Sequence, residues 1–586
     1  MCGIIGYIGK NVESNLYLGL ERLEYRGYDS SGMTIKRNND FTTYKATGVV
    51  EKLKSTIKEN EEFGIGIAHT RWATHGQISI ENCHPHFSSN GSTALVHNGI
   101  IENYEELKDD LIKKGKYFYG QTDSEVIAKL FDCKLDINNL RRVKKKLVGS
   151  YALAIISKNS DYIYFAKNKS PLYIALGSEC ALIASDPSCF VGFADGYITL
   201  EDGEYGKFSQ KEVIIYDKND KIVKKQPQKL DFSFINEEKS GYQHFMLKEI
   251  YQSRLALEKI MEVYRSYDIK EKLKELKNYE FDRIYLIGCG TAYHAGLIGG
   301  SYMREAFNID VFCEIASEIM YKNLNIDEKS LCIFISQSGE TADTLAALEY
   351  CKSRGGIIVA VTNTEYSSIA RKASINFPIC AGQEKAVAST KAYFAQCIVL
   401  YILTSYLKGN DYILPLYNFK RQIDFGDDNI LKTLAEKLAG YDKVFFIGRG
   451  RDYITAQEAS LKLKEITYIF STAQPSGELK HGVIALIDKS VPVIVIATDE
   501  NLFNKTLNNA YEIKARGGKL VLFTTLNTDS ETEKAFDYII KVKKPEKDFM
   551  PLQIILSLQK LAYFTAVTKG YDPDKPRNLA KSVTVE

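Results

Sequence analysis

The sequence has 586 residues, of which 45% are hydrophobic, and a formal net charge of only +2. This length exceeds what one hydrophobic core supports and predicts two to four domains. The small net charge gives no extended positive field, so we expect neither nucleic acid nor a membrane surface as a partner. The eleven cysteines include no Cys-x-x-Cys pair, and Cys83–His86 has no second ligand pair nearby, so we expect no metal and no other cofactor. No apolar run is long enough to span a bilayer, and a cytoplasmic protein with reduced thiols is the simplest expectation.

The first residues of the chain carry the strongest indication of chemistry. Once Met1 is removed, Cys2 becomes the N-terminal residue and carries both a thiol and a free α-amine. Such an amine has a pKa of roughly 7.7–8.0 and can accept the thiol proton without help from a histidine. The apolar run at 4–8 predicts a buried strand that holds the terminus in the interior. This segment alone fits an incidental cysteine in a strand equally well.

Polar clusters at the ends of apolar runs add to the case for catalysis. An arginine can hold a carboxylate and an aspartate can hold an ammonium group, so Arg71 and Asp123 together would bind an α-amino acid. Asn98 and Gly99 offer a side-chain amide and an unhindered backbone N–H, the two donors that an oxyanion needs. Together with Cys2, these groups predict a cysteine amidase that acts on an amino acid.

These residues, with the motif Tyr25–Asp29, resemble the N-terminal-nucleophile glutaminase domain of glutamine amidotransferases. The resemblance implies that Cys2 attacks the side-chain amide of L-glutamine and releases ammonia. It also implies an αββα sandwich, which agrees with the mixture of short strand and helix patterns up to about residue 230. For Trp72, the only tryptophan, the resemblance implies a gate for the ammonia passage, and core packing is the plain alternative. The glutamine-binding residues that it implies are Arg71, Trp72, Thr74, His75 and Asp123.

The second half contains an internal duplication. The segment 284–290 is echoed by 444–450, and 354–359 is echoed by 516–521, with nearly equal offsets of 160 and 162 residues. Apolar strands alternate with helices in each copy, which predicts two α/β units with doubly wound parallel sheets. A polar stretch before the duplication buries little and predicts a linker. The expected domains are a glutaminase domain at 1–216, a linker at 217–240, α/β units at 241–415 and 416–570, and a tail at 571–586.

Only the first copy carries a complete anion-binding loop. Ser336–Thr341 follows a buried strand and precedes a helix, so its hydroxyls, its glycine and the helix N-terminus form a phosphate cradle that needs no lysine. Ordinary helix capping is the alternative explanation for such a turn. The matching strand of the second copy runs into the acidic stretch Ala497–Glu500, which speaks against a second phosphate site.

The second half resembles a pair of sugar isomerase domains, and the whole chain is similar to the glutamine–fructose-6-phosphate aminotransferase family. The most specific segments of this end-to-end resemblance are the N-terminus, 336–341, 387–391, 477–482 and 576–586. The resemblance implies that ammonia from L-glutamine is used to convert D-fructose 6-phosphate to D-glucosamine 6-phosphate. The sugar-phosphate-binding residues that it implies are Thr291, Ser336, Gln337, Ser338, Thr341, Val387, Ser389, Glu458 and Lys462.

For the residues expected to catalyse the sugar reaction, sequence position alone and the family resemblance suggest different roles. Glu458, Lys462 and Glu465 share one helix face, and their spacing alone favours an exposed ladder of ion pairs. The resemblance instead assigns to Glu465 the proton transfer from C1 to C2. It also implies that His481 opens the sugar ring across a subunit interface, as in a homodimer, and that Lys581 forms a Schiff base with the ketone. A structural histidine and a solvated lysine are the ordinary alternatives.

The sequence departs from the family pattern in three places. Ala292 stands where Ser is frequent, Val483 stands where Pro is usual, and a Pro often seen just after Lys248–Arg254 is missing. The loss of one hydroxyl at Ala292 is expected to weaken sugar-phosphate affinity, whereas the other two changes affect loop geometry.

Two other functions compete with the coupled enzyme. One is a deglycase or an amidotransferase for a different phosphosugar, and an intact Cys2 combined with Glu465, His481 and Lys581 speaks against the simple deglycase. The other is a sensor that binds a phosphosugar without catalysis. Such a sensor would carry a DNA-binding segment, and the nearly neutral charge and the lack of a helix-turn-helix pattern speak against it.

Overall fold

The computed structural model describes residues 2–73, 75–132, 134–230 and 239–583. These residues form two compact units, Met1–Glu237 with Ala580–Glu586, and Glu238–Leu579. Thr74 lies outside the described residues, so its role stays a prediction. Within the described part of the chain, every helix is too short or too polar to cross a membrane.

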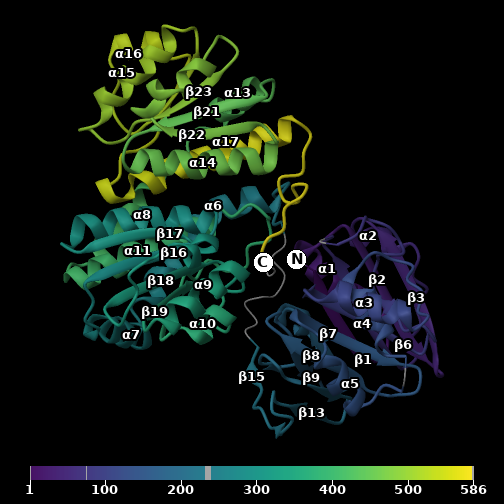
Figure 1. Cartoon of the computed structure of the whole chain (residues 1–586). Coiled ribbons are helices and arrows are strands. Elements are labelled where there is room, and N and C mark those ends of the chain that lie inside the picture. The colour runs from purple at the N-terminus through teal and green to yellow at the C-terminus, as the bar shows by residue number, and fades with distance from the viewer. Residues whose placement is uncertain (1, 74, 133, 231–238, 584–586) are drawn as a thin grey trace. The chain divides into compact units, whose positions relative to one another are not determined.

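The first unit contains two antiparallel sheets whose apolar faces pack together (Figure 1). Ile4 and Ile67 from one sheet meet Val96 and Ala154 from the other, and all four are fully buried. The strands of the first sheet, in spatial order, are β15 (Gln228–Lys229), β11 (Gly196–Thr199), β9 (Tyr173–Leu176), β10 (Ala181–Ala184), β1 (Gly3–Gly9), β4 (Gly64–Arg71), β2 (Ser30–Arg37) and β3 (Asp40–Thr47). Those of the second are β14 (Ile222–Val223), β13 (Val213–Tyr216), β12 (Tyr205–Phe208), β8 (Ile163–Asn168), β7 (Gly149–Ser157), β6 (Thr93–Ile101) and β5 (His86–Phe87).

Helices cover the outer faces of both sheets. On the first sheet, Leu16 of α1 (Val12–Leu23) packs in one cluster with strand residues. On the second, α4 (Asp123–Lys129) and α5 (Ile137–Lys144) pack against Leu153. The layers therefore run helix, sheet, sheet, helix, and the predicted αββα sandwich is confirmed. The unit also contains α2 (Val50–Lys54) and α3 (Tyr104–Lys113).

Part of the stretch predicted as a linker is paired in the sheets. Within 217–240, β14 pairs with β13, and β15 pairs with β11. Both are end strands of their sheets, where polar and charged side chains face water and discourage further pairing. The polar composition of this stretch therefore fits edge strands as well as a linker.

The second unit contains two five-stranded parallel sheets with the same strand order, which confirms the predicted duplication (Figure 1). In each sheet the first strand of the copy lies between the second and the third, so the chain reverses direction across the sheet at that point. The first sheet is β17 (Asp310–Ile315), β16 (Arg283–Gly288), β18 (Ser330–Ser336), β19 (Ile357–Thr362) and β20 (Ile375–Pro378). The second is β22 (Phe470–Pro475), β21 (Lys443–Gly448), β23 (Pro492–Ile496), β24 (Lys519–Thr524) and β25 (Tyr538–Lys541).

One continuous hydrophobic core serves one face of both sheets. Ile333 of β18 and Ile494 of β23 belong to the same buried cluster, together with most residues of α11 and α17. These two helices are apolar on nearly every side, as expected for helices buried all round. The helices of this core are α6 (Phe245–Val263), α7 (Tyr267–Asn278), α8 (Thr291–Ala306), α11 (Lys391–Lys408), α12 (Ile413–Gln422), α13 (Asp428–Leu438), α14 (Arg451–Thr467) and α17 (Met550–Thr568).

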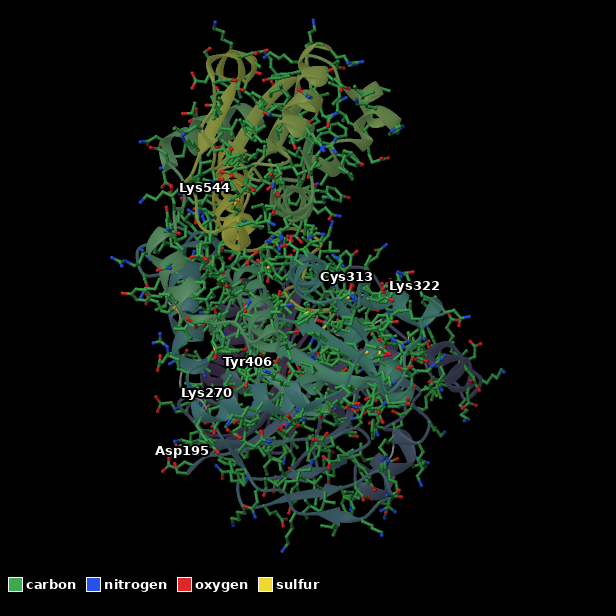
Figure 2. The ribbon with its side chains drawn as sticks, turned by 90° about the vertical axis from the view of Figure 1, so that its left-hand side faces the viewer. Asp195, Lys270, Cys313, Lys322, Tyr406 and Lys544 are labelled. Atoms are coloured by element: carbon green, nitrogen blue, oxygen red, sulfur yellow. The ribbon has the colours of Figure 1, made fainter. Side chains whose placement is uncertain are left out.

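The opposite faces have separate, smaller cores. The first sheet packs there against α9 (Ala342–Ser353) and α10 (Ser368–Lys372), and the second packs against α15 (Phe503–Lys514) and α16 (Ser530–Ala535). The outer strand β17 leaves more of its side chains open. Figure 2 labels Cys313 of this strand and Lys322, which follows it and donates to the Glu314 carboxylate at 2.5 Å. Both sheets are thus covered on both faces, as parallel sheets require.

The first part of the predicted tail is held in place by Asp574. Its carboxylate accepts the backbone N–H groups of Phe245 and Met246, each at 2.8 Å, at the N-terminus of α6. Its carbonyl accepts the N–H of Val387 at 3.1 Å. A helix N-terminus attracts a carboxylate, so these hydrogen bonds order this part of the tail. The polar composition of the tail does not reveal this interaction.

We expect Asp574→Ala to loosen the first turn of α6. Two buried N–H groups would lose a charged acceptor, at a cost of about 2 kcal/mol. Amide hydrogen exchange of Phe245 and Met246 should accelerate, whereas Asp574→Asn, which keeps one acceptor oxygen, should have a smaller effect. Unchanged exchange in Asp574→Ala would contradict this account of the tail.

Candidate functional site

The antiparallel pairing of β1 with β4 places the N-terminal cysteine beside the end of β4. Gly3 lies opposite Thr70, so Cys2 falls level with Arg71, one residue before Trp72. The Trp72 N–H donates to the Cys2 Sγ at 3.2 Å, and the thiol donates to the Trp72 carbonyl at 3.5 Å. Burial raises the pKa of the Cys2 thiol. The thiol therefore needs a nearby base to become a nucleophile, and an α-amine on the same residue would be one.

One of the predicted oxyanion donors, on the facing sheet, contacts Cys2, and the other is the next residue in sequence. Asn98 of β6 donates from Nδ2 to the Cys2 carbonyl at 3.0 Å. Gly99 has a φ of +131°, and a Cβ at this position would lie 2.1 Å from the Ser150 carbonyl oxygen. Only glycine fits there. The structure thus brings Cys2 to the neighbouring residues Asn98 and Gly99, although 96 residues separate Cys2 from Asn98.

The guanidinium of Arg71 holds the loop that follows β4. It donates to the carbonyl of His75 at 2.5 Å and to those of Gly76 and Gln77 at 3.3 Å each. Asp123, the first residue of α4, accepts the N–H of Ile101 at 2.9 Å. To grip a substrate as predicted, both side chains would have to exchange or share these backbone partners.

The motif Tyr25–Asp29 supports the same loop. Asp29 accepts the N–H of Ala73 at 2.9 Å, and the ring of Tyr28 meets that of Trp72 edge to face, with centroids 5.7 Å apart. The contacts of this motif therefore position Trp72 and the backbone beside it. The sequence showed that the motif was present but not which part of the site it served.

The anion-binding loop lies where the strand order reverses, the usual ligand position in such sheets. Ser336 ends β18, and its hydroxyl accepts the N–H of Gly339 and pairs with the Thr341 hydroxyl, both at 3.0 Å. Ser338 accepts the N–H of Glu340 at 3.2 Å. Thr341 precedes α9 but its side chain does not cap that helix. Helix capping therefore does not explain the Thr341 hydroxyl, and the N-terminus of α9 remains suited to an anion.

In the second copy a carboxylate fills the equivalent place. Asp452, in the first turn of α14, accepts the backbone N–H of Thr498 at 2.8 Å and its hydroxyl at 2.5 Å. Asp452 is buried, and burial raises its pKa to about 6. Gly290 and Gly450 precede α8 and α14 with φ of 53° and 56°, so Ala292 occupies the matching position in the first copy. The first copy thus has a small residue where the second has a carboxylate that binds the loop after β23.

Glu458, Lys462 and Glu465 form a cluster with α8 in which the first two are buried and Glu465 is half-buried, so the exposed ladder expected from spacing alone is wrong. The Lys462 Nζ lies 2.6 Å from Glu465 Oε2 and 3.6 Å from Glu458 Oε1, and the Lys462 side chain is 1% exposed. It also donates to the Thr291 hydroxyl at 3.0 Å, which in turn donates to Glu458 at 3.1 Å. Burial works against the ammonium, but the Glu465 and Glu458 carboxylates outweigh it and raise the pKa of Lys462.

His294 is a member of this cluster that sequence reasoning did not single out. Its Nδ1 lies 2.7 Å from Glu458 Oε2. The only feature of the sequence that pointed to His294 was its position three residues after Thr291, which puts both on the same face of α8. Among the other predicted residues, Gln337 is half-buried and its carbonyl accepts the N–H of Asn363 at 3.2 Å.

Two buried glutamates shape the loop that carries Val387 and Ser389. Glu384 accepts the Ser389 hydroxyl at 2.6 Å and the N–H groups of Thr390 and Ala392 at the start of α11. Glu249 of α6 accepts the N–H groups of Lys385 and Ala386. Isolated acidic residues in apolar surroundings gave no sequence signal for this positioning role.

Two further predicted catalytic residues are His481, in a short helix of the second unit, and Lys581, in the C-terminal tail. His481 ends the short helix η5 (Glu478–His481) and is exposed. Lys581 is half-buried and belongs to the first unit, whereas Glu465 belongs to the second. Their predicted roles therefore rest on the resemblance.

Known proteins match both units. A family model described as a glutamine amidotransferase domain matches residues 69–192, and one described as a SIS domain matches 279–406 and 437–567. A protein of Fusobacterium nucleatum named glutamine–fructose-6-phosphate aminotransferase (isomerizing) is 42% identical over 609 residues, and one of Thermotoga maritima with the same name is 39% identical over 609 residues. Both alignments cover 100% of each chain. The chain belongs to the glutamine–fructose-6-phosphate aminotransferase family.

Solved structures agree with this membership. The C-terminal domain of glucosamine-fructose-6-phosphate aminotransferase from Francisella tularensis matches with a TM-score of 0.53 and 35% identity, over 58% of this chain and 100% of that chain. A putative phosphosugar isomerase from Silicibacter pomeroyi, at 21% identity and a TM-score of 0.50, covers 56% of this chain and 100% of its own and shares the fold. This aminotransferase family member is accordingly an enzyme with a glutaminase half and a duplicated sugar isomerase half.

We expect Asp452→Asn to change how the stability of this aminotransferase depends on pH. The pKa of Asp452 is about 6 in the folded chain, whereas an unperturbed aspartate, as in the unfolded chain, has a pKa of 3.8. The folded chain therefore binds more protons between these values, and the free energy of unfolding falls as pH rises through them. The variant carries no such charge, so its stability relative to the parent should rise by about 2 kcal/mol between about pH 4.5 and 7.5. Urea unfolding at several pH values measures this, and parallel pH profiles would contradict it.

Proposed function

We propose that this enzyme hydrolyses L-glutamine at Cys2, passes the ammonia to its sugar isomerase half and converts D-fructose 6-phosphate to D-glucosamine 6-phosphate. The observation that carries the proposal is that one chain holds two complementary groups of residues. One is a half-buried thiol near the N-terminus beside an amide donor, and the other is a loop of hydroxyl groups at a helix N-terminus, in the same unit as a lysine–glutamate cluster. The relatives that match end to end carry the name of this reaction.

In the glutaminase half, the α-amine of Cys2 takes the thiol proton, and the thiolate attacks the carboxamide carbon of glutamine. The oxygen becomes an oxyanion that accepts from Asn98 Nδ2 and the Gly99 N–H. The amine then returns the proton to the leaving nitrogen, ammonia departs, and water hydrolyses the thioester to glutamate. Glutamine is held by Arg71, Trp72, Thr74, His75 and Asp123.

In the sugar isomerase half, His481 opens the ring of fructose 6-phosphate and Lys581 forms a Schiff base with the C2 ketone. Ammonia replaces the lysine at C2, and Glu465 moves a proton from C1 to C2 to give the amino aldose. Lys462 holds the Glu465 carboxylate at 2.6 Å and so positions it for this transfer. The phosphate and the sugar contact Thr291, Ser336, Gln337, Ser338, Thr341, Val387, Ser389, Glu458 and Lys462.

The same proposal includes the assembly and the surroundings of the enzyme. The exposed position of His481 supports a homodimer in which each chain supplies this residue to its partner. All ten cysteines within the described residues are free thiols, which fits the cytoplasm. The proposed domains are 1–216, 241–415 and 416–570, with a linker at 217–240 and a catalytic tail at 571–586.

A reaction with glutamine and fructose 6-phosphate tests the coupling. The enzyme should form glutamate and glucosamine 6-phosphate in equal amounts. Cys2→Ala should form neither from glutamine, because the nucleophile is gone, but should still make the amino sugar from added ammonium. Glutamate without amino sugar in the parent enzyme would refute the assigned acceptor.

A second test addresses the isomerisation step. Glu465→Gln cannot accept a proton, so amino-sugar formation should fall at least about 100-fold while glutamine hydrolysis continues. The neighbouring Lys464 is exposed, and Lys464→Ala serves as a control with parental activity. Equal losses of amino-sugar formation in the two variants would show that the loss comes from disruption of the helix and not from removal of the carboxylate.

A further inference from the structure

The side-chain amide of Asn98 is held at both ends. Its Nδ2 donates to the Cys2 carbonyl at 3.0 Å, and its Oδ1 lies 3.0 Å from the Nε2 of His69. The same His69 Nε2 lies 2.9 Å from the carbonyl oxygen of His97. Both partners of Nε2 are acceptors, so we assign the proton to Nε2 and leave Nδ1 bare.

The ring of His69 is fixed in this orientation by packing. His69 is fully buried in the middle of β4, opposite Ile4 on one side and Gly32 on the other. The ring of His84 lies on it, with centroids 3.9 Å apart. A Cβ at Gly32 would lie 2.3 Å from the His84 carbonyl, so glycine is what lets His84 approach the sheet.

His69 stays neutral over the working pH range. Burial lowers its pKa to about 3, and its Nδ1 has no hydrogen-bond partner among the described residues. A neutral ring with one proton can donate only from Nε2, toward the carbonyl of His97 and the amide oxygen of Asn98.

The two ends of an asparagine amide have nearly the same shape, so packing alone does not decide which end faces Cys2. We propose that His69 is a positioning residue that fixes the Asn98 amide with Nδ2 toward Cys2, where the oxyanion forms. The role rests on the proposed glutaminase function, and it goes beyond it by naming what sets the donor. With the amide turned by 180°, an acceptor would face the oxyanion, and one donor would be lost.

The test compares three substitutions of His69 in the full chain. In His69→Gln the side-chain nitrogen reaches close to the place of Nε2, whereas in His69→Asn it reaches only the place of Nδ1. We expect His69→Leu and His69→Asn to lower kcat for glutamine hydrolysis about 10- to 100-fold, with KM for glutamine changed less than about threefold. His69→Gln should recover to within about fivefold of the parent. The control His86→Gln makes the same change in another buried ring, whose Nε2 faces the Thr122 hydroxyl, and should stay within about threefold.

Further measurements separate this role from a structural one. Alkylation of Cys2 by iodoacetamide needs no oxyanion donor and should keep its rate in all variants, and ammonium-dependent amino-sugar formation should be unchanged. Parental kcat in His69→Leu, equal losses in the Gln and Asn variants, or a loss confined to KM would overturn the inference. If His69→Leu does not fold, the Gln and Asn pair decides.

The failure of the proposed function is distinguishable from the failure of this inference. A parent enzyme that releases no glutamate refutes the function. The orientation of the Asn98 amide, read from its hydrogen-bond partners in crystals of the parent and His69→Asn, then decides the inference by itself. A turned amide in the variant supports the role of His69, and an unchanged amide overturns it.

Discussion

Both candidate sites form where strands and helices from different parts of the chain bring polar side chains together. In the first unit, antiparallel pairing sets the beginning of β1 beside the end of β4, so an N-terminal thiol meets the backbone of Trp72. The facing sheet then supplies Asn98 at the same edge. In the second unit all strands of a sheet point the same way, and loops with hydroxyls gather at one edge. In both units the buried polar side chains of the site pair mainly with one another or with the backbone, because burying a polar group without a partner is costly.

The two copies of the second unit show how duplication can lead to different uses of one fold. Their sheets have the same order and share a continuous core, so neither copy could change its architecture without disturbing the other. The difference lies in single side chains. Asp452 binds the loop after β23 in the second copy with its carboxylate, whereas the first copy has Ala292 at the matching position. The second copy contributes instead through α14, whose Glu458 and Lys462 reach Thr291 at the start of α8.

Sequence reasoning succeeded where a local pattern has one physical solution. Alternating apolar runs marked the strands of the sandwich, and repeated strand–helix segments marked the duplicated α/β copies. It failed where a local pattern allows several environments. The spacing of Glu458, Lys462 and Glu465 is the same on an exposed helix and on one buried against α8, and the structure shows the buried case. Tail ordering was also missed, because the partner of Asp574 is the start of a helix more than three hundred residues away.

The sequence by itself determined the fold class, the order of domains and the chemical character of most candidate residues, because periodicity and residue type act over a few neighbouring positions. The tertiary structure alone decided which of these residues meet. The placement of Cys2 beside Asn98, the tautomer of His69 and the binding of the loop after β23 by Asp452 all depend on contacts between distant segments. Such contacts are set by how layers pack and by which buried polar atoms need partners, and neither can be read from a linear pattern.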